Sequence, residues 1–181
     1  MHLSKAAELD PFSIVGLFYI SAGYYRTNFM DKAGEYAKRI IALEDNFSYG
    51  HLMLGAVSWM TNNDIENLIK ETERAVQLEG NLTNYGYLAG VYAIAGQHDK
   101  AREILQIMDK LSGDRSMGIA KYGFVYSCLS EFDEAFKYFN RAVDRREGLI
   151  LDLAFRLDME FPALKNDPRL AALRDRIGLP R

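Results

Sequence analysis

The chain has 181 residues and a formal net charge of -3, with 49% hydrophobic and 26% charged residues. This length suits one domain or one repeat array, and the composition excludes a disordered tail, a collagen-like fibre and a polytopic membrane protein. The mild acidity argues against a dedicated nucleic-acid binder, which usually carries a basic face.

Residues 1–11 are expected to be the second half of a partial repeat. The chain repeats with a period of about 34 residues, and Ala6 lies one period before Ile40. Ile40 belongs to the second helix of the next unit. We expect the apolar side of this short helix to pack on the helix that begins near Phe12. Repeat units bury their core by stacking on neighbours, so a half-unit suggests a fragment of a longer protein. A natural amphipathic cap is the alternative.

The first residues are too charged and too little apolar for a signal peptide.

The 34-residue period extends over residues 12–147. One column of the repeat holds only small residues: Ser21, Gly55, Ala89 and Gly123. A second column holds turn-forming residues: Asn28, Asn62, Gly96 and Ser130. The period predicts four units, at about residues 14–47, 48–81, 82–115 and 116–147.

Within each unit, the charge pattern predicts two helices of different character. The first helix falls in a run almost without charge, because residues 11–25, 46–63 and 81–97 hold no Asp, Glu, Lys or Arg and residues 116–130 hold only Lys121. The second helix is amphipathic, as in residues 31–43. We therefore expect the first helix to be buried on two faces and the second on one. The small column lets the two backbones approach, facing alanines of the second helix: Ala33, Ala101 and Ala135.

The period fails after residue 147, and residues 148–181 are expected to cap the array with helices. Pro162 interrupts the chain, because proline breaks helix interiors. Asp167-Pro168 predicts an N-cap and first helical position, and Gly178 predicts the end of that helix. The apolar face of this helix consists of Leu170, Leu173 and Ile177. We expect these side chains to be buried against residues 149–157.

The sequence contains no catalytic, metal-binding or cofactor-binding constellation. The histidines are isolated, with none at the i, i+4 spacing of a helical metal pair. No Gly-rich phosphate loop follows a strand pattern. We therefore predict that the protein is not an enzyme and has no metal or cofactor. The lone cysteine, Cys128, favours the cytoplasm. The uncharged runs are too short and too polar for membrane helices, so neither a membrane nor a nucleic-acid partner is expected.

These patterns resemble the tetratricopeptide repeat (TPR), a 34-residue helix–turn–helix. The fourth unit matches best, with Tyr122-Gly123-x2-Tyr126 followed by Ala135-x3-Phe139. The second unit slips by one residue, so that Ala75 takes the expected position 74 and the loop at residues 61–64 absorbs the extra residue. The resemblance covers about residues 3 to 147. It implies an all-α fold, an α–α superhelix built as a solenoid of antiparallel helix hairpins.

The segment at residues 161–180 is similar to the closing segment of many bacterial tetratricopeptide proteins, in which the array often follows an effector domain. The resemblance implies a non-catalytic protein–protein interaction scaffold. It further implies the C-terminal regulatory or sensory module of a larger bacterial signalling protein.

The resemblance also implies a concave groove that binds a protein or peptide partner. Carried over from the family's positions, its lining includes Phe18, Tyr25, Arg26, Tyr49, Leu52, Trp59, Met60, Lys121 and Phe124. Phe18 and Ala22, or Leu52 and Ala56, stand where chaperone-binding members carry the Lys and Asn of a carboxylate clamp, and only Lys121 could contribute a cation. The sequence therefore favours an apolar or aromatic peptide or helix. The aromatic residues can equally be core residues. A homo-oligomerisation module and a small-molecule sensor using the same groove remain alternatives.

Overall fold

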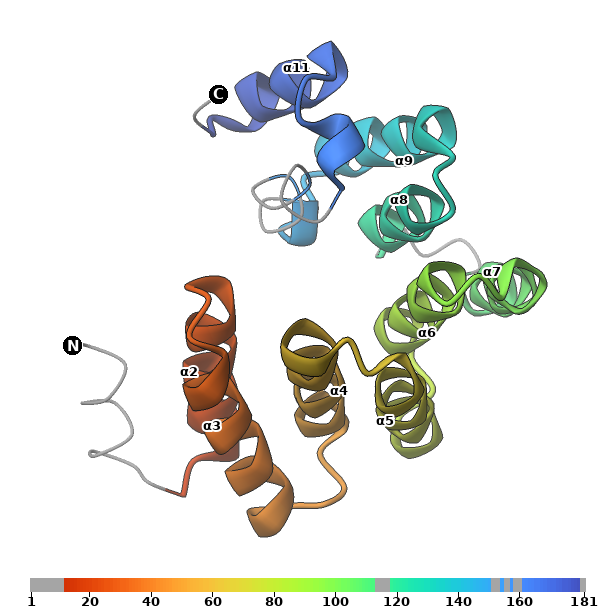
Figure 1. Cartoon of the computed structure of the whole chain (residues 1–181). Coiled ribbons are helices and arrows are strands. Elements are labelled where there is room, and N and C mark those ends of the chain that lie inside the picture. The colour runs from red at the N-terminus through yellow and green to blue at the C-terminus, as the bar shows by residue number, and fades with distance from the viewer. Residues whose placement is uncertain (1–11, 113–117, 151–153, 155–156, 158–160, 180–181) are drawn as a thin grey trace. The chain divides into compact units, whose positions relative to one another are not determined.

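A computed structural model describes residues 12–112, 118–150, 154, 157 and 161–179 of the chain. The described residues form α-helices and one short 3-10 helix, with no strand among them (Figure 1). The all-α prediction is therefore confirmed. The chain divides into an N-terminal half, residues 1–80, and a C-terminal half, residues 81–181. The helix expected within residues 1–11 lies outside the described residues.

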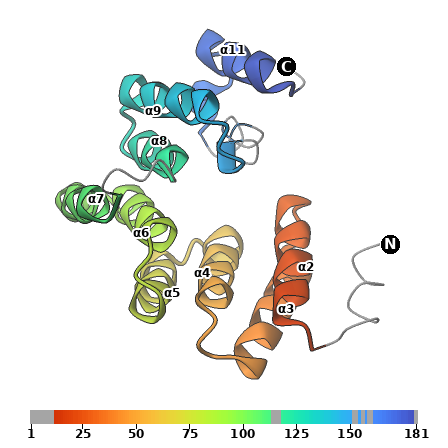
Figure 2. The ribbon, with the colours of Figure 1, turned by 180° about the vertical axis from the view of Figure 1, so that it is seen from behind.

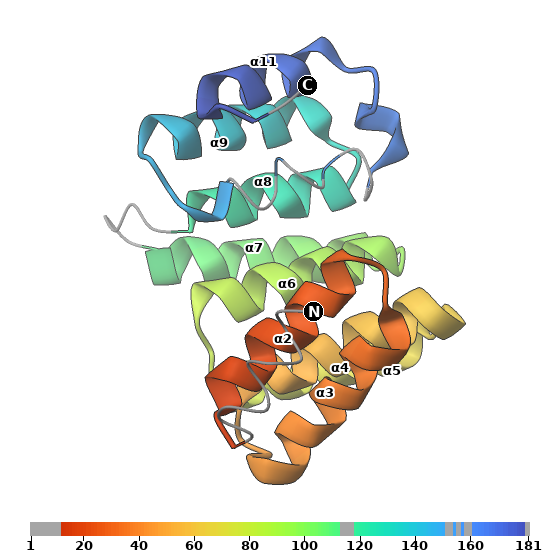
Figure 3. The same cartoon turned by 90° about the vertical axis from the view of Figure 1, so that its left-hand side faces the viewer.

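The N-terminal half contains two antiparallel helix hairpins, and the second helix of one packs against the first helix of the next (Figure 3). The hairpins are α2 (Ile14–Arg26) with α3 (Met30–Leu43), and α4 (Ser48–Asn62) with α5 (Ile65–Leu78). Ser13 caps α2, because its hydroxyl accepts a hydrogen bond from the Gly16 amide. Asp64 caps α5 in the same way, through the Asn67 amide.

The C-terminal half repeats the hairpin and adds a closing segment (Figure 2). Its helices are α6 (Leu82–Ile94), α7 (His98–Ser112), α8 (Ile119–Cys128), α9 (Phe132–Asp144), the 3-10 helix η1 (Pro162–Leu164) and α11 (Pro168–Ile177). Helix α6 packs on α8, and α11 packs on α9. The first residues of α2, α4 and α6 are each one repeat period apart, as the sequence predicts.

The turns between paired helices lie where the sequence predicts them, with one shift. Asn28, Gly96 and Ser130 have φ of 62°, 74° and 61°, the left-handed conformation that ends a helix and reverses the chain. In the second hairpin the residue with positive φ is Asn63, not Asn62. The extra residue expected in this loop accounts for the shift, because α5 also begins one residue later than the period requires.

The small residues of the first helices lie at close helix contacts, as expected; Ser21 meets the expected alanine, whereas Gly55 and Gly123 meet other residues. A Cβ atom at Gly55 would lie 3.1 Å from the Cβ of Glu71 and 3.4 Å from the Cα of Leu68. At Gly123, it would lie 2.4 Å from the ring of Phe139. In the first hairpin, the Ser21 hydroxyl donates a 2.8 Å hydrogen bond to the Ala33 carbonyl.

The closing segment buries two of the three residues expected from its sequence, Leu170 and Leu173, whereas the third, Ile177, is only partly buried and packs against the same core. Leu164, Leu170 and Leu173 are at most 2% exposed and share one core with other buried residues, among them Ile150, Ala154 and Leu157. Asp167 caps α11 through the Arg169 amide, and Gly178, with φ of 73°, ends it. The N-cap and the end of this helix are therefore confirmed.

Glu147 caps the start of α8 from a position well beyond that helix in the chain. Its two carboxylate oxygens accept hydrogen bonds from the amides of Ile119 and Ala120, at 2.9 and 3.0 Å. The N-cap residue of α8 is Gly118, whose lack of a side chain leaves these amides to Glu147. The negative carboxylate is also favoured at the positive end of the helix dipole.

Replacing Glu147 with Ala is expected to lower the free energy of unfolding by about 1.5–3 kcal/mol, the usual contribution of a hydrogen bond to a charged group. The measurement is urea unfolding followed by circular dichroism. Glu103→Ala, an exposed acid on α7, is the control and should change stability by no more than about 0.5 kcal/mol. Equal stability of the two variants would show that the carboxylate does not stabilise α8.

Candidate partner-binding surface

Three aromatic rings form a cluster on α2 and α4 in the N-terminal half, which we call the α2/α4 cluster. It consists of Phe18, Phe47 and Tyr49, all half-buried. The Phe18 ring centroid lies 5.3 Å from that of Tyr49 and 6.1 Å from that of Phe47. Two of the groove residues predicted from sequence, Phe18 and Tyr49, are thus in contact. Tyr25 packs with Phe18 against a small core of Ala22, Ala37 and Met53.

The other groove residues predicted in this half lie on the same two helices but outside the α2/α4 cluster. Leu52 and Trp59 are half-buried on α4, and Met60 is 51% exposed. Arg26 is exposed in the last turn of α2. The family positions did not include Phe47, which precedes the first residue of α4. The aromatic pair Phe47 and Tyr49 in the sequence was the signal that could have identified it.

Lys121 is fully buried in the C-terminal half, between α6 and α8. Its stem lies over Gly86, where a Cβ atom would be 3.0 Å from the Lys121 Cβ. Its ammonium nitrogen lies 3.2 Å from the centroid of the Tyr87 ring and 5.5 Å from that of Phe124. No hydrogen-bond acceptor reaches the ammonium among the described residues. The aromatic faces therefore stabilise its charge, and they also cover it.

Two further aromatic residues belong to this cluster that were not among the groove residues predicted from sequence. Tyr87 packs edge-on against Phe124, with ring centroids 6.0 Å apart, and the Phe161 ring also packs edge-on against Phe124, at 6.3 Å. Tyr87 stands one period before Lys121, so the repeat itself contained the signal. Phe161 follows the last repeat, where the period gives no position.

His51 joins α4 to α5 through a buried hydrogen bond and to the preceding loop through a partly buried one. Its Nδ1 lies 2.7 Å from a carboxylate oxygen of Glu71, and its Nε2 lies 2.9 Å from the carbonyl oxygen of Asp45. His51 and Glu71 are 6% and 8% exposed. This pair holds two helices and a loop together, because a buried polar group is stable only when it is hydrogen-bonded. Nothing in the spacing of these residues along the chain indicated the contact.

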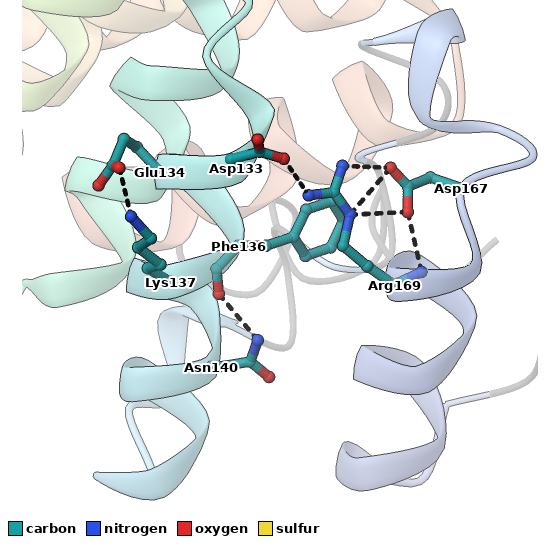
Figure 4. Close-up of polar contacts among 7 residues, drawn as sticks. All are labelled: Asp133, Glu134, Phe136, Lys137, Asn140, Asp167 and Arg169. Atoms are coloured by element: carbon teal, nitrogen blue, oxygen red, sulfur yellow. Dashed lines mark hydrogen bonds and ion pairs between the residues drawn. The ribbon is translucent and has the colours of Figure 1, made fainter.

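A charged group fixes α11 on α9 (Figure 4). The Arg169 guanidinium bonds the carboxylates of Asp167 and Asp133, at 2.7 and 2.6 Å, and lies over the Phe136 ring. The hydrogen bond from Arg169 lowers the pKa of the Asp167 carboxyl below its ordinary value. A hollow of about 440 Å³ beside these residues is lined by Arg169 and by residues 130–134. Arg169 pairs with both carboxylates and joins the start of α11 to α9, so this group serves helix docking.

Two further properties concern the described residues as a whole. None of the helices there has the length and apolar character needed to span a lipid bilayer. The same residues bring together no group of three or more His, Cys, Asp or Glu side chains that could hold a metal ion.

No protein-family model matches the sequence, and no curated protein matches it. Several solved structures share its fold. A thermophilic TPR protein of Thermus thermophilus, TTC0263, aligns with a TM-score of 0.65 at 15% identity, over 98% of this chain and 88% of that one. YrrB, described as a TPR protein with an unusual peptide-binding site, aligns with a TM-score of 0.53 at 15% identity, over 97% and 90% of the two chains. MamA aligns with a TM-score of 0.52 at 24% identity, over 80% and 84%. The chain therefore has the TPR fold, a solenoid of helix hairpins.

Proposed function

We propose that the protein is a non-catalytic interaction scaffold that binds an apolar or aromatic peptide or helix. The observation that carries this proposal is the half-buried α2/α4 cluster, whose rings leave part of their surface open to a partner. The proposed contact residues are those expected from sequence in the N-terminal half: Phe18, Tyr25, Arg26, Tyr49, Leu52, Trp59 and Met60. Lys121 and Phe124, expected in the other half, are left out of this surface, because Lys121 is fully buried and Phe124 covers it.

The residue types support an apolar or aromatic partner over an acidic one. Tyr, Trp and Arg are the residues most enriched where binding energy concentrates, and Tyr25, Trp59 and Arg26 are of these types. Lys121 lies behind the rings of Tyr87 and Phe124, so it presents no open positive charge to a carboxylate. We therefore expect the affinity to change little with salt concentration. The peptide-binding site named for YrrB, a protein of similar fold, supports the general role of a binding module.

The double substitution Tyr25→Ala with Trp59→Ala is expected to abolish partner capture while leaving the helical fold intact. Both side chains are half-buried on the proposed surface, and truncating such anchors typically weakens binding by about 2 kcal/mol or more each. The measurement is a pull-down of partners from lysate at low and high salt, with the fold checked by circular dichroism.

Phe29→Ala provides the matched control, because Phe29 is an aromatic residue that is 59% exposed at the turn between α2 and α3. It should capture the same partners as the unaltered chain. Unchanged capture by a folded Tyr25→Ala, Trp59→Ala double variant would exclude this surface as the binding site. Capture that vanishes at high salt would argue for a charged partner instead.

We further propose that the chain is the cytoplasmic regulatory or sensory part of a larger bacterial signalling protein. The similarity of residues 161–180 to the closing segments of such arrays supports this context. The DNA sequence upstream of Met1 tests it directly. An open frame encoding an effector domain is expected, and a stop codon close before Met1 would contradict the proposal.

A further inference from the structure

Both ring nitrogens of the buried His51 face oxygen atoms. Nδ1 lies 2.7 Å from a carboxylate oxygen of Glu71 on α5, and Nε2 lies 2.9 Å from the backbone carbonyl oxygen of Asp45 in the loop before α4. A carbonyl oxygen can only accept a hydrogen bond, so Nε2 must carry a hydrogen. A neutral imidazole carries a hydrogen on one nitrogen alone, so Nδ1 then has none to donate to Glu71.

This arrangement requires one more proton than a neutral histidine and an ionised glutamate supply together. The proton is either on Nδ1, which makes an imidazolium beside a carboxylate, or on Glu71, whose hydroxyl then donates to Nδ1. Without this proton, the lone pair of Nδ1 would face a carboxylate oxygen at 2.7 Å, and both side chains are buried. Two acceptors at this distance repel each other, and burial prevents water from satisfying them.

The charged groups around His51 favour the added proton. Two acids lie near the ring, because the Asp45 carboxylate is 3.7 Å from Nε2 and Glu71 is at Nδ1. The Arg74 guanidinium of α5 lies 3.6 Å from the other oxygen of the Asp45 carboxylate, and both of these side chains contact solvent. Helix α3 packs on this part of α4 through the apolar side chain of Ile40. The acids nearest to the ring therefore attract a positive charge to the pair.

We propose that His51 and Glu71 share a proton that fixes the loop of residues 44–47 on α4, and that loss of this proton at alkaline pH releases the loop. The loop ends at Phe47, whose ring packs on the two other rings of the α2/α4 cluster. The shared proton thereby holds Phe47 in the cluster. An effect of pH on partner capture rests on the proposed function, whereas the shared proton does not.

Urea unfolding of the full chain at pH values from about 6 to about 9 tests the proposal, because ordinary histidines lose their proton near the start of this range and ordinary carboxyl groups and lysines do not titrate in it. Stability falls with rising pH wherever the folded chain binds more protons than the unfolded chain. The unfolding equilibrium constant of the unaltered chain is therefore expected to increase at least about tenfold across this range. A constant that stays the same or decreases would overturn the proposal.

Glu71→Gln is the matched variant, because a glutamine amide donates to Nδ1 while Nε2 donates to Asp45, with no added proton. Its unfolding constant should change less than about twofold over the same pH range. His98→Gln is the control, because His98 is exposed at the start of α7, and it should keep the pH dependence of the unaltered chain. The amino terminus and Cys128 also titrate in this range and are common to all three chains. Equal pH dependence of Glu71→Gln and the unaltered chain would overturn the proposal.

Nuclear magnetic resonance of the unaltered chain provides a second measurement, which needs neither a variant nor a partner. The nuclear Overhauser contact between the rings of Phe18 and Phe47, whose centroids are 6.1 Å apart, is expected at about pH 6 and should weaken as the pH rises to about 9. The contact between Tyr24 and Tyr36, stacked at 5.7 Å in the same half, should persist. A Phe18–Phe47 contact of unchanged strength at the alkaline end would overturn the release of the loop.

Discussion

A chain that ends at Glu160 is expected to lose several kcal/mol of stability and to aggregate. The deletion removes Leu164, Leu170 and Leu173, which are at most 2% exposed in the core of the C-terminal half. Burying one such side chain stabilises a protein by ~1.5–3 kcal/mol. The total free energy of unfolding of a domain is only about 5–15 kcal/mol. The loss would also expose the apolar surface of Ile150 and Leu157, which favours association.

Two single substitutions separate the loss of this core from the loss of surface contacts. Leu173→Ala is expected to reduce the free energy of unfolding by about 2–5 kcal/mol, as large-to-small changes in cores do. Arg176→Ala removes an exposed ion pair with Asp144 and should change it by no more than about 1 kcal/mol. Thermal unfolding and light scattering of all three chains provide the measurements. A truncated chain that melts at the original temperature and stays monomeric would refute the capping role of the closing segment.

Gly123→Val is expected to reduce the free energy of unfolding by about 3 kcal/mol, at the upper end of the usual range for overpacked cores. A Cβ atom at this position would lie 2.4, 2.5 and 3.0 Å from three atoms of the Phe139 ring. Phe139 is fully buried, so its ring has no open space to move into. The gain in helix propensity on replacing glycine is about 1 kcal/mol or less and cannot offset such a collision.

Gly148→Ala is the matched control for Gly123→Val, because a Cβ atom there meets nothing within 4 Å and the residue does not have positive φ. Chemical unfolding should show this variant within about 0.5 kcal/mol of the unaltered chain. If Gly123→Val were as stable as Gly148→Ala, the close approach of α8 and α9 would not depend on the small residue.

The sequence by itself determined the hairpins, because their signals are local or periodic. Uncharged and amphipathic segments alternate with the repeat period, and Asn28, Gly96 and Ser130 are residue types suited to reversing the chain between paired helices. Asp167-Pro168 and Gly178 set the ends of α11 in the same local way. Such signals depend on residues within one helix or turn, so they can be recognised without knowing how the helices pack.

Part of the candidate surface also followed from sequence. The repeat positions identified Phe18 and Tyr49, whose rings are in contact, because residues at equivalent positions of stacked repeats lie on equivalent faces. They did not indicate that Lys121 is fully buried, since burial depends on the rings of Tyr87 and Phe124 that close over it.

Only the tertiary structure decided the contacts between residues distant in sequence. The carboxylate of Glu147 caps α8, and His51 bonds Glu71 on the next helix, although neither pair is close along the chain. Any of several acidic residues could fill these roles on the basis of sequence alone. Which one does so depends on the distance and angle at which the helices pack, and packing is set by the close approaches at residues such as Gly55 and Gly123.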